Sequence, residues 1–200
     1  LHLCDRRQRQ MCIRDSPVLV ERSSYESHPL GRLEWIRLYG VLFDKEEEAD
    51  SFYEAELEKL EPIMKKESCN VTVAFFSVTA NGTISVRKSN DYVAQMIALS
   101  GGTYVPEQLA SEEENALSTM NIQMEDFYAD AKNADILIYN STIEGEISTL
   151  EELKQKNALF ADFQAVQDGN VYCTTNNFFQ KSTAIGDFME DLNKIFQNTD

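Results

Sequence analysis

The sequence predicts an α/β protein over residues 66–200, with helices on both faces of a mainly parallel sheet. Short apolar runs typical of buried strands occur at 71–76, 134–139 and 171–174, and helical stretches separate them. Strands that alternate with helices favour βαβ units, which build a three-layer α/β/α arrangement. With 42% hydrophobic and 10% aromatic residues, the 200-residue chain has enough apolar side chains to fill such a core.

Before this predicted sheet, the chain carries a long amphipathic helix over residues 45–65. Its apolar side chains follow helical spacing from Ala49 to Met64, and charged residues occupy the other faces. Pro62 bends or ends the helix. The charged faces are those of a solvated helix.

A shorter helix and the end of a strand precede the long helix. Leu33 and its apolar neighbours predict a helix that Gly40 weakens near its end, and Asp44 is placed to cap the helix that follows. The apolar run at residues 17–21 follows a proline and reads as the end of a strand, with a loop over 23–31.

The first half of the sheet region begins with the buried strand at 71–76. Gly82 marks a turn into a second strand over 83–86, and Asn90 caps a helix that stops at Gly101. The glutamates at 112–114 lie in a polar loop.

The second half opens with a helix over residues 122–132 and the strand at 134–139. Thr149 and Glu152 form a capping box for the next helix. Gly169 marks the turn before the strand at 171–174, and a terminal helix follows over 184–196.

Residues 1–16 differ in composition from the remainder. They contain four of the 18 basic residues but two of the 34 acidic ones, with neither an initiator Met nor the apolar core of a signal peptide. The string RQMCIRDS resembles translated sequencing adapter, so we expect a non-native segment; a disordered basic tail is the alternative.

Two of the four cysteines, Cys4 and Cys12, lie in that opening segment. Cys69 and Cys173 are isolated cysteines and indicate neither a disulfide framework nor a zinc site. The cysteine content therefore does not determine the redox compartment of the protein. Each lies at or near a predicted strand, where we expect a buried free thiol.

The charge and the missing motifs exclude several function classes. A net charge of −16 disfavours nucleic acid or an anionic membrane as the main partner. His28 is the one histidine beyond residue 16, which rules out a histidine-based triad or a histidine-rich metal site within this chain. No glycine-rich phosphate-binding motif follows a predicted strand. We expect no metal site, no cofactor and no catalysis.

Four segments, taken together, resemble one family of transport proteins. Their order and spacing are similar to those of the solute-binding proteins of ABC transporters for iron chelates, haem and cobalamin. The segments are ESHPLGRLEWIRLYG (26–40), FFSVTANGTISVRKSNDYVAQMIALSGGTYV (75–105), MEDFYADAKNADILIYN (124–140) and FQAVQDGNVYCTTNNFF (163–179).

The resemblance implies two α/β lobes joined by a rigid helix. Residues 17–44 would then be the remnant of an N-terminal lobe, residues 45–65 the connecting helix and residues 66–200 the C-terminal lobe. Most of the N-terminal lobe would be missing. Such proteins are exported, as periplasmic proteins or as lipoproteins, and we expect a monomer.

The resemblance also places Glu125 at the position of a glutamate that projects from the lobe toward an arginine of the membrane permease. A carboxylate that meets arginine across an interface forms a charge-assisted hydrogen bond and fixes the register. Glu125 near a helix N-terminus also complements the helix dipole, which is a purely structural alternative.

The ligand contacts are expected in loops at the carboxyl ends of the parallel strands. Arg87, Lys88 and Tyr92 are placed to meet an anionic ferric chelate or a haem propionate, although both cations could simply offset nearby acids. After the last strand, the candidates are Asn177, Phe178, Phe179 and Gln180, whose two aromatic rings cover either a core edge or a flat ligand. Tyr139 and Asn140 end the middle strand and are weaker candidates.

Two functions from different classes follow. The first is a transport receptor for a pre-chelated metal, most simply an iron chelate, which closes on its ligand and docks on a permease. The second is an enzyme or a metal-cluster protein that shares the two-lobed fold. That alternative requires cysteine ligands near the cleft, and neither Cys69 nor Cys173 is expected at a ligand-side strand end.

Overall fold

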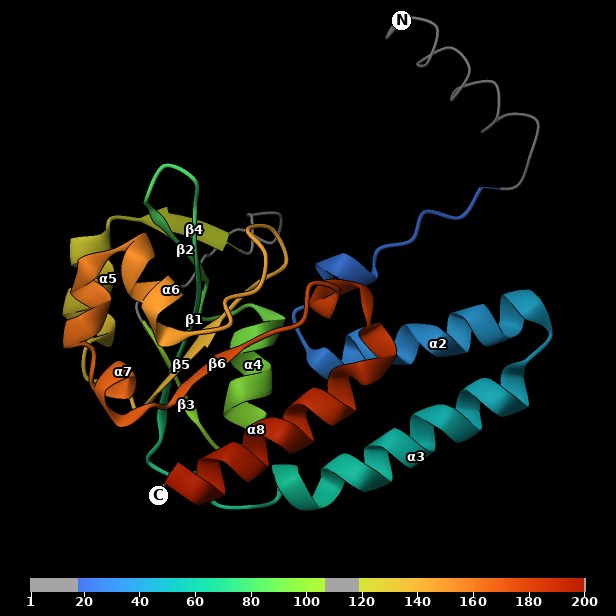
Figure 1. The fold of residues 1–200 in the computed structure, drawn as a ribbon. Helices are drawn as coiled ribbons and strands as arrows, with labels where there is room; N and C mark the ends of the chain where they lie inside the picture. Colours follow the sequence, from blue (N-terminus) through green and yellow to red (C-terminus); the bar gives the residue numbers. More distant parts are fainter. Residues whose placement is uncertain (1–17, 107–118, 200) are drawn as a thin grey trace, which may run out of the picture.

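The computed structural model describes residues 18–106 and 119–199. Over these two ranges the chain forms a six-stranded sheet between two layers of helices, with a long helical hairpin beside it (Figure 1). This arrangement confirms the predicted α/β fold class.

The sheet is mainly parallel and has the order β4-β2-β1-β5-β6, with β3 also paired to β1. Strands β1, β3, β5 and β6 run parallel, whereas β2 and β4 are antiparallel to their neighbours. Strands β2 and β3 share one side of β1, because β3 pairs with its first half and β2 with its last. The bounds are β1 Thr72–Val78, β2 Ile84–Arg87, β3 Thr103–Val105, β4 Thr119–Ile122, β5 Ile136–Tyr139 and β6 Val171–Cys173.

Alternate side chains of the central strands enter two separate apolar clusters. In β1, Val73 and Phe75 face one cluster, while Ala74 and Phe76 face the other. The first cluster is closed by α3 (Glu46–Met64), α4 (Tyr92–Leu99) and α8 (Ile185–Thr199). The second is closed by α5 (Met124–Ala131), α6 (Leu150–Lys156), η2 (Ala158–Asp162) and α7 (Gln164–Asp168).

Helices α2 (Pro29–Phe43) and α3 (Glu46–Met64) form an antiparallel hairpin (Figure 1). A Cβ atom at Gly40 would lie 2.6 Å from the Cβ of Ala49, so glycine permits the close approach of the two helices. The helix α2 therefore continues through Gly40, where the sequence suggested its end. Asp44 ends α2 with a left-handed φ of 58°. Contrary to our expectation, it does not cap α3, whose N-cap residue is Lys45.

Ion pairs connect the two helices of the hairpin to each other and connect the hairpin to the sheet domain. Arg37 on α2 donates to the carboxylates of Asp50 and Glu54 on α3, each at 2.7 Å. On the other side of α3, Lys59 pairs with Asp187 of α8. The long helix is thus held against both α2 and the C-terminal helix.

Three local predictions are wrong. Residues 18–22 form no strand, because no described segment pairs with them, and Val20 is 70% exposed. Asp91, not Asn90, caps α4 by accepting a hydrogen bond from the amide of Val93 at 3.0 Å. The helix predicted over 122–132 is α5, which begins only at Met124 because Thr119–Ile122 pairs with β2 as strand β4.

Other local signals are confirmed. Thr149 accepts a hydrogen bond from the amide of Glu152 at 3.2 Å, and Gly169 adopts a left-handed φ of 80° at the end of α7. Short 3-10 helices η1 (Ser23–Tyr25), η3 (Phe178–Gln180) and η4 (Ser182–Ala184) complete the fold. The expected polar loop at 112–114 lies outside the described residues.

Candidate functional site

The carboxyl ends of β1, β5 and β6 lie at one edge of the sheet, as parallel pairing requires. The loops after β5 and β6 are joined there, because the amide of Ser141 donates to the hydroxyl of Thr174 at 3.1 Å. Open α/β sheets bind their ligands beyond this edge. Segments that reach it are therefore the first place to look for a site.

Three residues that the sequence singled out meet where the segments after β2 and β6 approach each other. The guanidinium of Arg87, the last residue of β2, lies 4.3 Å from the ring centroid of Phe179 in η3. The rings of Phe179 and Tyr92, the first residue of α4, have centroids 6.4 Å apart. Segments more than 80 residues apart in the chain thus form one surface.

Two further residues complete this group and were missed by the sequence analysis. The guanidinium of Arg32 on α2 lies 3.5 Å from the ring centroid of Tyr92, and Asp91 lies 3.7 Å from Arg87. Nothing in the local sequence pattern links Arg32 to α4. We refer to Arg32, Arg87, Asp91, Tyr92 and Phe179 as the arginine cluster.

Burial governs the electrostatics of the arginine cluster. Desolvation raises the pKa of the Asp91 carboxyl above its ordinary value, although Arg87 and Arg32 act in the opposite direction. Desolvation likewise raises the pKa of Tyr92 to about 12, and burial lowers the pKa of Arg32. Arg32 and Arg87 thus lie in one partly buried group with the Asp91 carboxylate, and the Glu26 carboxylate also acts on Arg32.

The other candidates from the same loops have different surroundings. Lys88 is half-buried directly after β2, and Asn177 and Gln180 are exposed at the ends of η3. Phe178 packs toward the first apolar cluster, with its ring centroid 4.7 Å from that of Phe188. Both rings of the aromatic pair cover an edge of this core, and Phe179 also contacts Arg87 and Tyr92.

The two candidates at the end of β5 do not reach this surface. Tyr139 is fully buried in the second apolar cluster, because its side chain alternates to the face covered by α5 and α6. Asn140 is 8% exposed, and its side-chain oxygen accepts hydrogen bonds from the amide of Thr142 at 3.2 Å and from its hydroxyl at 2.6 Å. Both side chains serve the fold in this structure.

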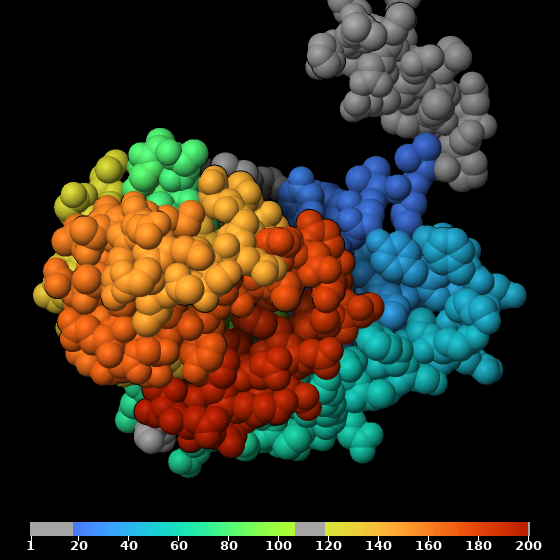
Figure 2. Space-filling view, viewed as in Figure 1, coloured from blue at the N-terminus to red at the C-terminus, as the bar shows by residue number. Residues whose placement is uncertain are grey.

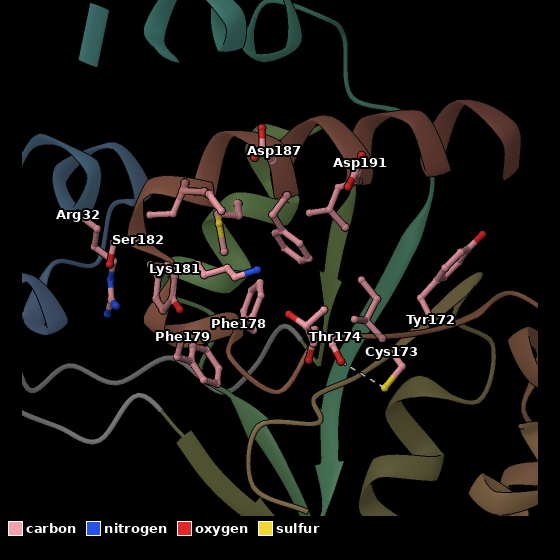
Figure 3. A pocket seen from close by; sticks show the side chains of 18 of the residues that line it. Arg32, Tyr172, Cys173, Thr174, Phe178, Phe179, Lys181, Ser182, Asp187 and Asp191 are labelled. Atoms are coloured by element: carbon pink, nitrogen blue, oxygen red, sulfur yellow. Dashed lines mark hydrogen bonds between the residues drawn. The ribbon is translucent and has the colours of Figure 1, made fainter. Parts of the chain in front are cut away.

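A cavity of about 390 Å³ opens next to the arginine cluster and continues along α8. Figure 2 shows the surface hollowed between α8 and the segments that precede it. In Figure 3, Phe178, Phe179 and Lys181 line one end of the cavity, and Tyr172 and Cys173 line the other.

Glu125 belongs to helix α5, which lies in the helix layer on the face of the sheet opposite α8 (Figure 1). It occupies the first turn of α5 and is exposed. Among the described residues no basic side chain forms an ion pair with it. The carboxylate is therefore accessible to a partner, and its position also complements the helix dipole.

The cysteine predictions need correction. Cys173 is the last residue of β6, at the carboxyl edge, and it is exposed and lines the cavity. Cys69 is half-buried rather than buried and precedes β1, where its thiol donates to the carbonyl of Gly101 at 3.0 Å. Cys173 is thus at a ligand-side strand end, contrary to expectation, because β6 ends one residue earlier than predicted.

Within residues 18–106 and 119–199, no group of three or more histidine, cysteine or acidic side chains is arranged to hold a metal ion. In the same ranges, no helix has the length and apolar character needed to span a bilayer.

Comparison with known structures identifies the architecture. A possible iron-binding, periplasmic solute-binding protein from Staphylococcus epidermidis superposes with a TM-score of 0.67 at 16% identity, over 93% of this chain and 69% of that one. A periplasmic haem-binding protein from a Roseiflexus species gives 0.67 at 17% identity, over 86% and 64% of the two chains. The periplasmic vitamin B12-binding protein of Vibrio cholerae gives 0.62 at 12% identity, over 98% and 70%.

Curated relatives come from Methanocaldococcus jannaschii. An uncharacterized lipoprotein is 29% identical over 157 residues, which cover 78% of this chain and 36% of the relative. A second uncharacterized lipoprotein is 29% identical over 176 residues, 84% of this chain and 43% of the relative. The chain thus spans less than half the length of either relative. No protein-family model matches the sequence.

Proposed function

We propose that this chain, which has the fold of the ABC-transporter substrate-binding proteins for iron siderophores, haem and vitamin B12, belongs to the receptor component of an uptake transporter. The observation that carries the proposal is the arginine cluster. Arg32, Arg87 and Phe179 come from three distant segments and meet on one surface, and Phe179 follows β6, whose carboxyl end lies at the edge where open α/β sheets bind ligands.

The ligand we propose is a chelated metal, and specifically an anionic iron chelate. The described residues offer cationic and aromatic groups at this edge but no cluster of metal ligands, so the metal would arrive already coordinated. Guanidinium groups suit planar, bidentate acceptors such as carboxylates. Phe179 adds an apolar face for a flat or aromatic ligand, and Lys88 adds a third cation nearby.

The mechanism requires no bond to be made or broken. A second lobe, which the family resemblance of the sequence implies, would close over the ligand from the side of α2. Arg32 lies on α2 and contacts Tyr92 of the C-terminal lobe. A movement of α2 relative to this lobe on closure would therefore change the contact between Arg32 and Tyr92. Ligand and closed receptor would then dock together on a membrane permease.

We further propose that Glu125 is the docking carboxylate on this lobe. Its exposure leaves it accessible to an arginine of the permease, and its place on the opposite helix layer keeps it out of the ligand site. Two of the curated relatives are lipoproteins, which supports an exported protein anchored outside the membrane.

Direct titration tests the ligand class. Trp35 is the single tryptophan and reports binding of ferric siderophores, haem or cobalamin by fluorescence quenching. We expect a ferric siderophore to bind most tightly, and Lys88→Ala to weaken it about tenfold, the cost of one charge-assisted contact. Lys154→Ala removes the same charge from α6 and serves as the matched control. Absence of saturable binding for all three ligands would contradict the proposal.

Uptake by cells that lack their own receptor tests the docking residue. We expect Glu125→Ala to abolish transport and to leave ligand affinity unchanged, whereas Asp126→Ala, in the same exposed turn, retains transport. Normal transport by the Glu125 variant would show that this assignment is wrong.

A further inference from the structure

Three triplets of the chain match the acceptor sequence Asn-x-Ser/Thr of N-linked glycosylation, and the structure gives them different surroundings. They are the triplets at 70–72, 81–83 and 140–142. A transferase that modifies a folded protein must reach both the asparagine and the hydroxyl residue two positions later. Accessibility therefore decides between the three triplets.

The triplet that begins at Asn140 is inaccessible. Asn140 is 8% exposed, and its Oδ1 atom accepts hydrogen bonds from the amide and the hydroxyl of Thr142 at 3.2 and 2.6 Å. The middle residue, Ser141, is buried and bonded to Thr174. Extraction of this segment would break the connection between the loops after β5 and β6.

Asn70 is exposed, but the rest of its triplet is held in the sheet. Val71 is buried, and Thr72 is the first residue of β1. Thr72 donates to the Asp135 carboxylate through its amide at 2.7 Å and through its hydroxyl at 2.6 Å. The hydroxyl that the acceptor sequence requires is thus occupied, and its release would need local opening of the sheet.

Asn81 lies at the tip of the hairpin that joins β1 to β2, which rises above the sheet in Figure 1. Asn81 and Gly82 are both exposed, and Gly82 forms the turn with a left-handed φ of 83°. A Cβ atom at Gly82 would meet no atom within 4 Å. The outer side of this triplet is therefore open to an enzyme.

Hydrogen bonds within the hairpin tip leave the reactive atom of Asn81 available. The Thr83 hydroxyl donates to the Oδ1 atom of Asn81 at 3.0 Å, and the amide of Gly82 donates to the carbonyl of Thr79 at 2.9 Å. N-linked glycans are attached to the other side-chain atom, Nδ2. No residue in the described ranges accepts a hydrogen bond from Nδ2 of Asn81.

We propose that Asn81 is an N-glycosylation site of the folded protein. In the transfer, Nδ2 of Asn81 attacks the anomeric carbon of an oligosaccharide that is carried on a lipid pyrophosphate. The bond from that carbon to the pyrophosphate oxygen breaks, the lipid pyrophosphate leaves, and a base of the transferase takes the amide proton. This inference rests on the proposed function in one respect: donor and transferase act outside the cytoplasm, so the protein must be exported.

A glycan on Asn81 would be attached outside the ligand site. None of the residues of the hairpin tip lines the cavity, so we expect modification to leave ligand affinity unchanged. Ile84 pairs with Ile122 at the end of β4, and α5 begins at Met124. The glycan would therefore lie at the end of the sheet where α5 starts, beside the surface that carries Glu125.

Glycan transfer to the full, folded chain tests the proposal. The chain is incubated with a single-subunit oligosaccharyltransferase that requires only Asn-x-Ser/Thr and with its lipid-linked donor, and glycopeptides are quantified by mass spectrometry. We expect at least about tenfold more glycan at Asn81 than at Asn70 or Asn140, because those two need local unfolding. Asn81→Gln and Thr83→Ala should abolish transfer, Thr83→Ser should keep it, and the matched control Asn70→Gln should have no effect.

Synthetic peptides that carry the three triplets serve as unfolded acceptors. All three should be modified to a similar extent, because the fold restricts transfer to Asn81. Different transfer among the peptides would assign the selectivity to sequence and overturn the structural argument. No transfer to Asn81 in the folded chain, or equal transfer to Asn70 and Asn140, would overturn the proposal itself.

The same experiment separates this inference from the proposed function. The mass measurement involves no chelate, so absence of siderophore binding would contradict only the proposed function. Absence of glycan transfer to Asn81 would contradict only the modification site.

Discussion

Replacing Arg87 by methionine tests how much the ion pair between Arg87 and Asp91 contributes to the stability of the fold. The side chains of Arg87 and Asp91 lie 3.7 Å apart and are 11% and 3% exposed, respectively. The substitution therefore leaves a buried carboxylate with one charged neighbour fewer. Methionine keeps the apolar contact with Phe179. Breaking a buried pair costs about 3–5 kcal/mol.

The free energy needed to protonate Asp91 is an upper limit on that cost, because a carboxylate that has lost its partner can take up a proton and become neutral. Protonating a carboxyl of ordinary pKa costs about 1.4 kcal/mol for each pH unit above about 3.9, hence about 4 kcal/mol at pH 7 and about 1.5 kcal/mol at pH 5. We therefore expect Arg87→Met to lower the free energy of unfolding by about 3 kcal/mol at pH 7 and by about half as much at pH 5.

The sign of the pH dependence follows from the direction of the shift. Burial raises the pKa of Asp91 in the folded protein, so the folded state holds this proton more tightly than the unfolded state does. Stability from this group is present at low pH and is lost as the pH rises above the ordinary aspartate pKa. Loss of Arg87 raises the pKa further and steepens that decline.

Urea denaturation followed by circular dichroism at pH 5 and pH 7 measures the effect. The double variant Arg87→Met with Asp91→Asn should recover most of the lost stability, because the buried carboxylate is removed together with its partner. Arg37→Met is the control: Arg37 also pairs with two carboxylates, but at the surface, so its loss should change stability little and equally at both pH values. An Arg87→Met penalty that is independent of pH, or no recovery in the double variant, would refute this reasoning.

Two further predictions concern the packing that holds the site in place. Gly102→Ala should lower the free energy of unfolding by about 1–3 kcal/mol in urea denaturation, since its Cβ would lie 2.8 Å from the ring of the buried Phe196. Gly145→Ala is the control, because its Cβ would meet no atom within 4 Å. It carries only the strain of a left-handed φ of 82° and should therefore cost less. Equal losses would show that Phe196 moves aside. Asp135→Ala should lower the free energy of unfolding by about 1–3 kcal/mol and speed hydrogen exchange at the amide of Thr72. The reason is that the Asp135 carboxylate accepts hydrogen bonds from that amide, at 2.7 Å, and from the hydroxyl of Thr72. Unchanged exchange would show that another acceptor replaces the carboxylate.

Local patterns were sufficient for much of the architecture. The apolar runs of β1 and β5, the spacing along α3 and the turn at Gly169 were all predicted, because side-chain periodicity and backbone freedom act within a few residues. Prediction failed where a short segment depends on a distant partner. β3 and β4 have three and four residues and exist only because β1 and β2 pair with them.

The same distinction divides the candidate site. The sequence by itself identified Arg87, Tyr92 and Phe179 as residues with suitable chemistry after predicted strands. The tertiary structure brought them together, added Arg32 from α2, and buried the side chains of Tyr139 and Asn140.

The physical reason is that residue type and local spacing determine which groups are available and which elements form. Strand register and helix packing determine which face of the sheet each group occupies and which distant group it meets. Tyr139 shows this most clearly: a change of one residue in register would turn its ring toward the other face of the sheet. Sequence alone therefore determined the fold class and the chemical inventory, and tertiary packing decided the site.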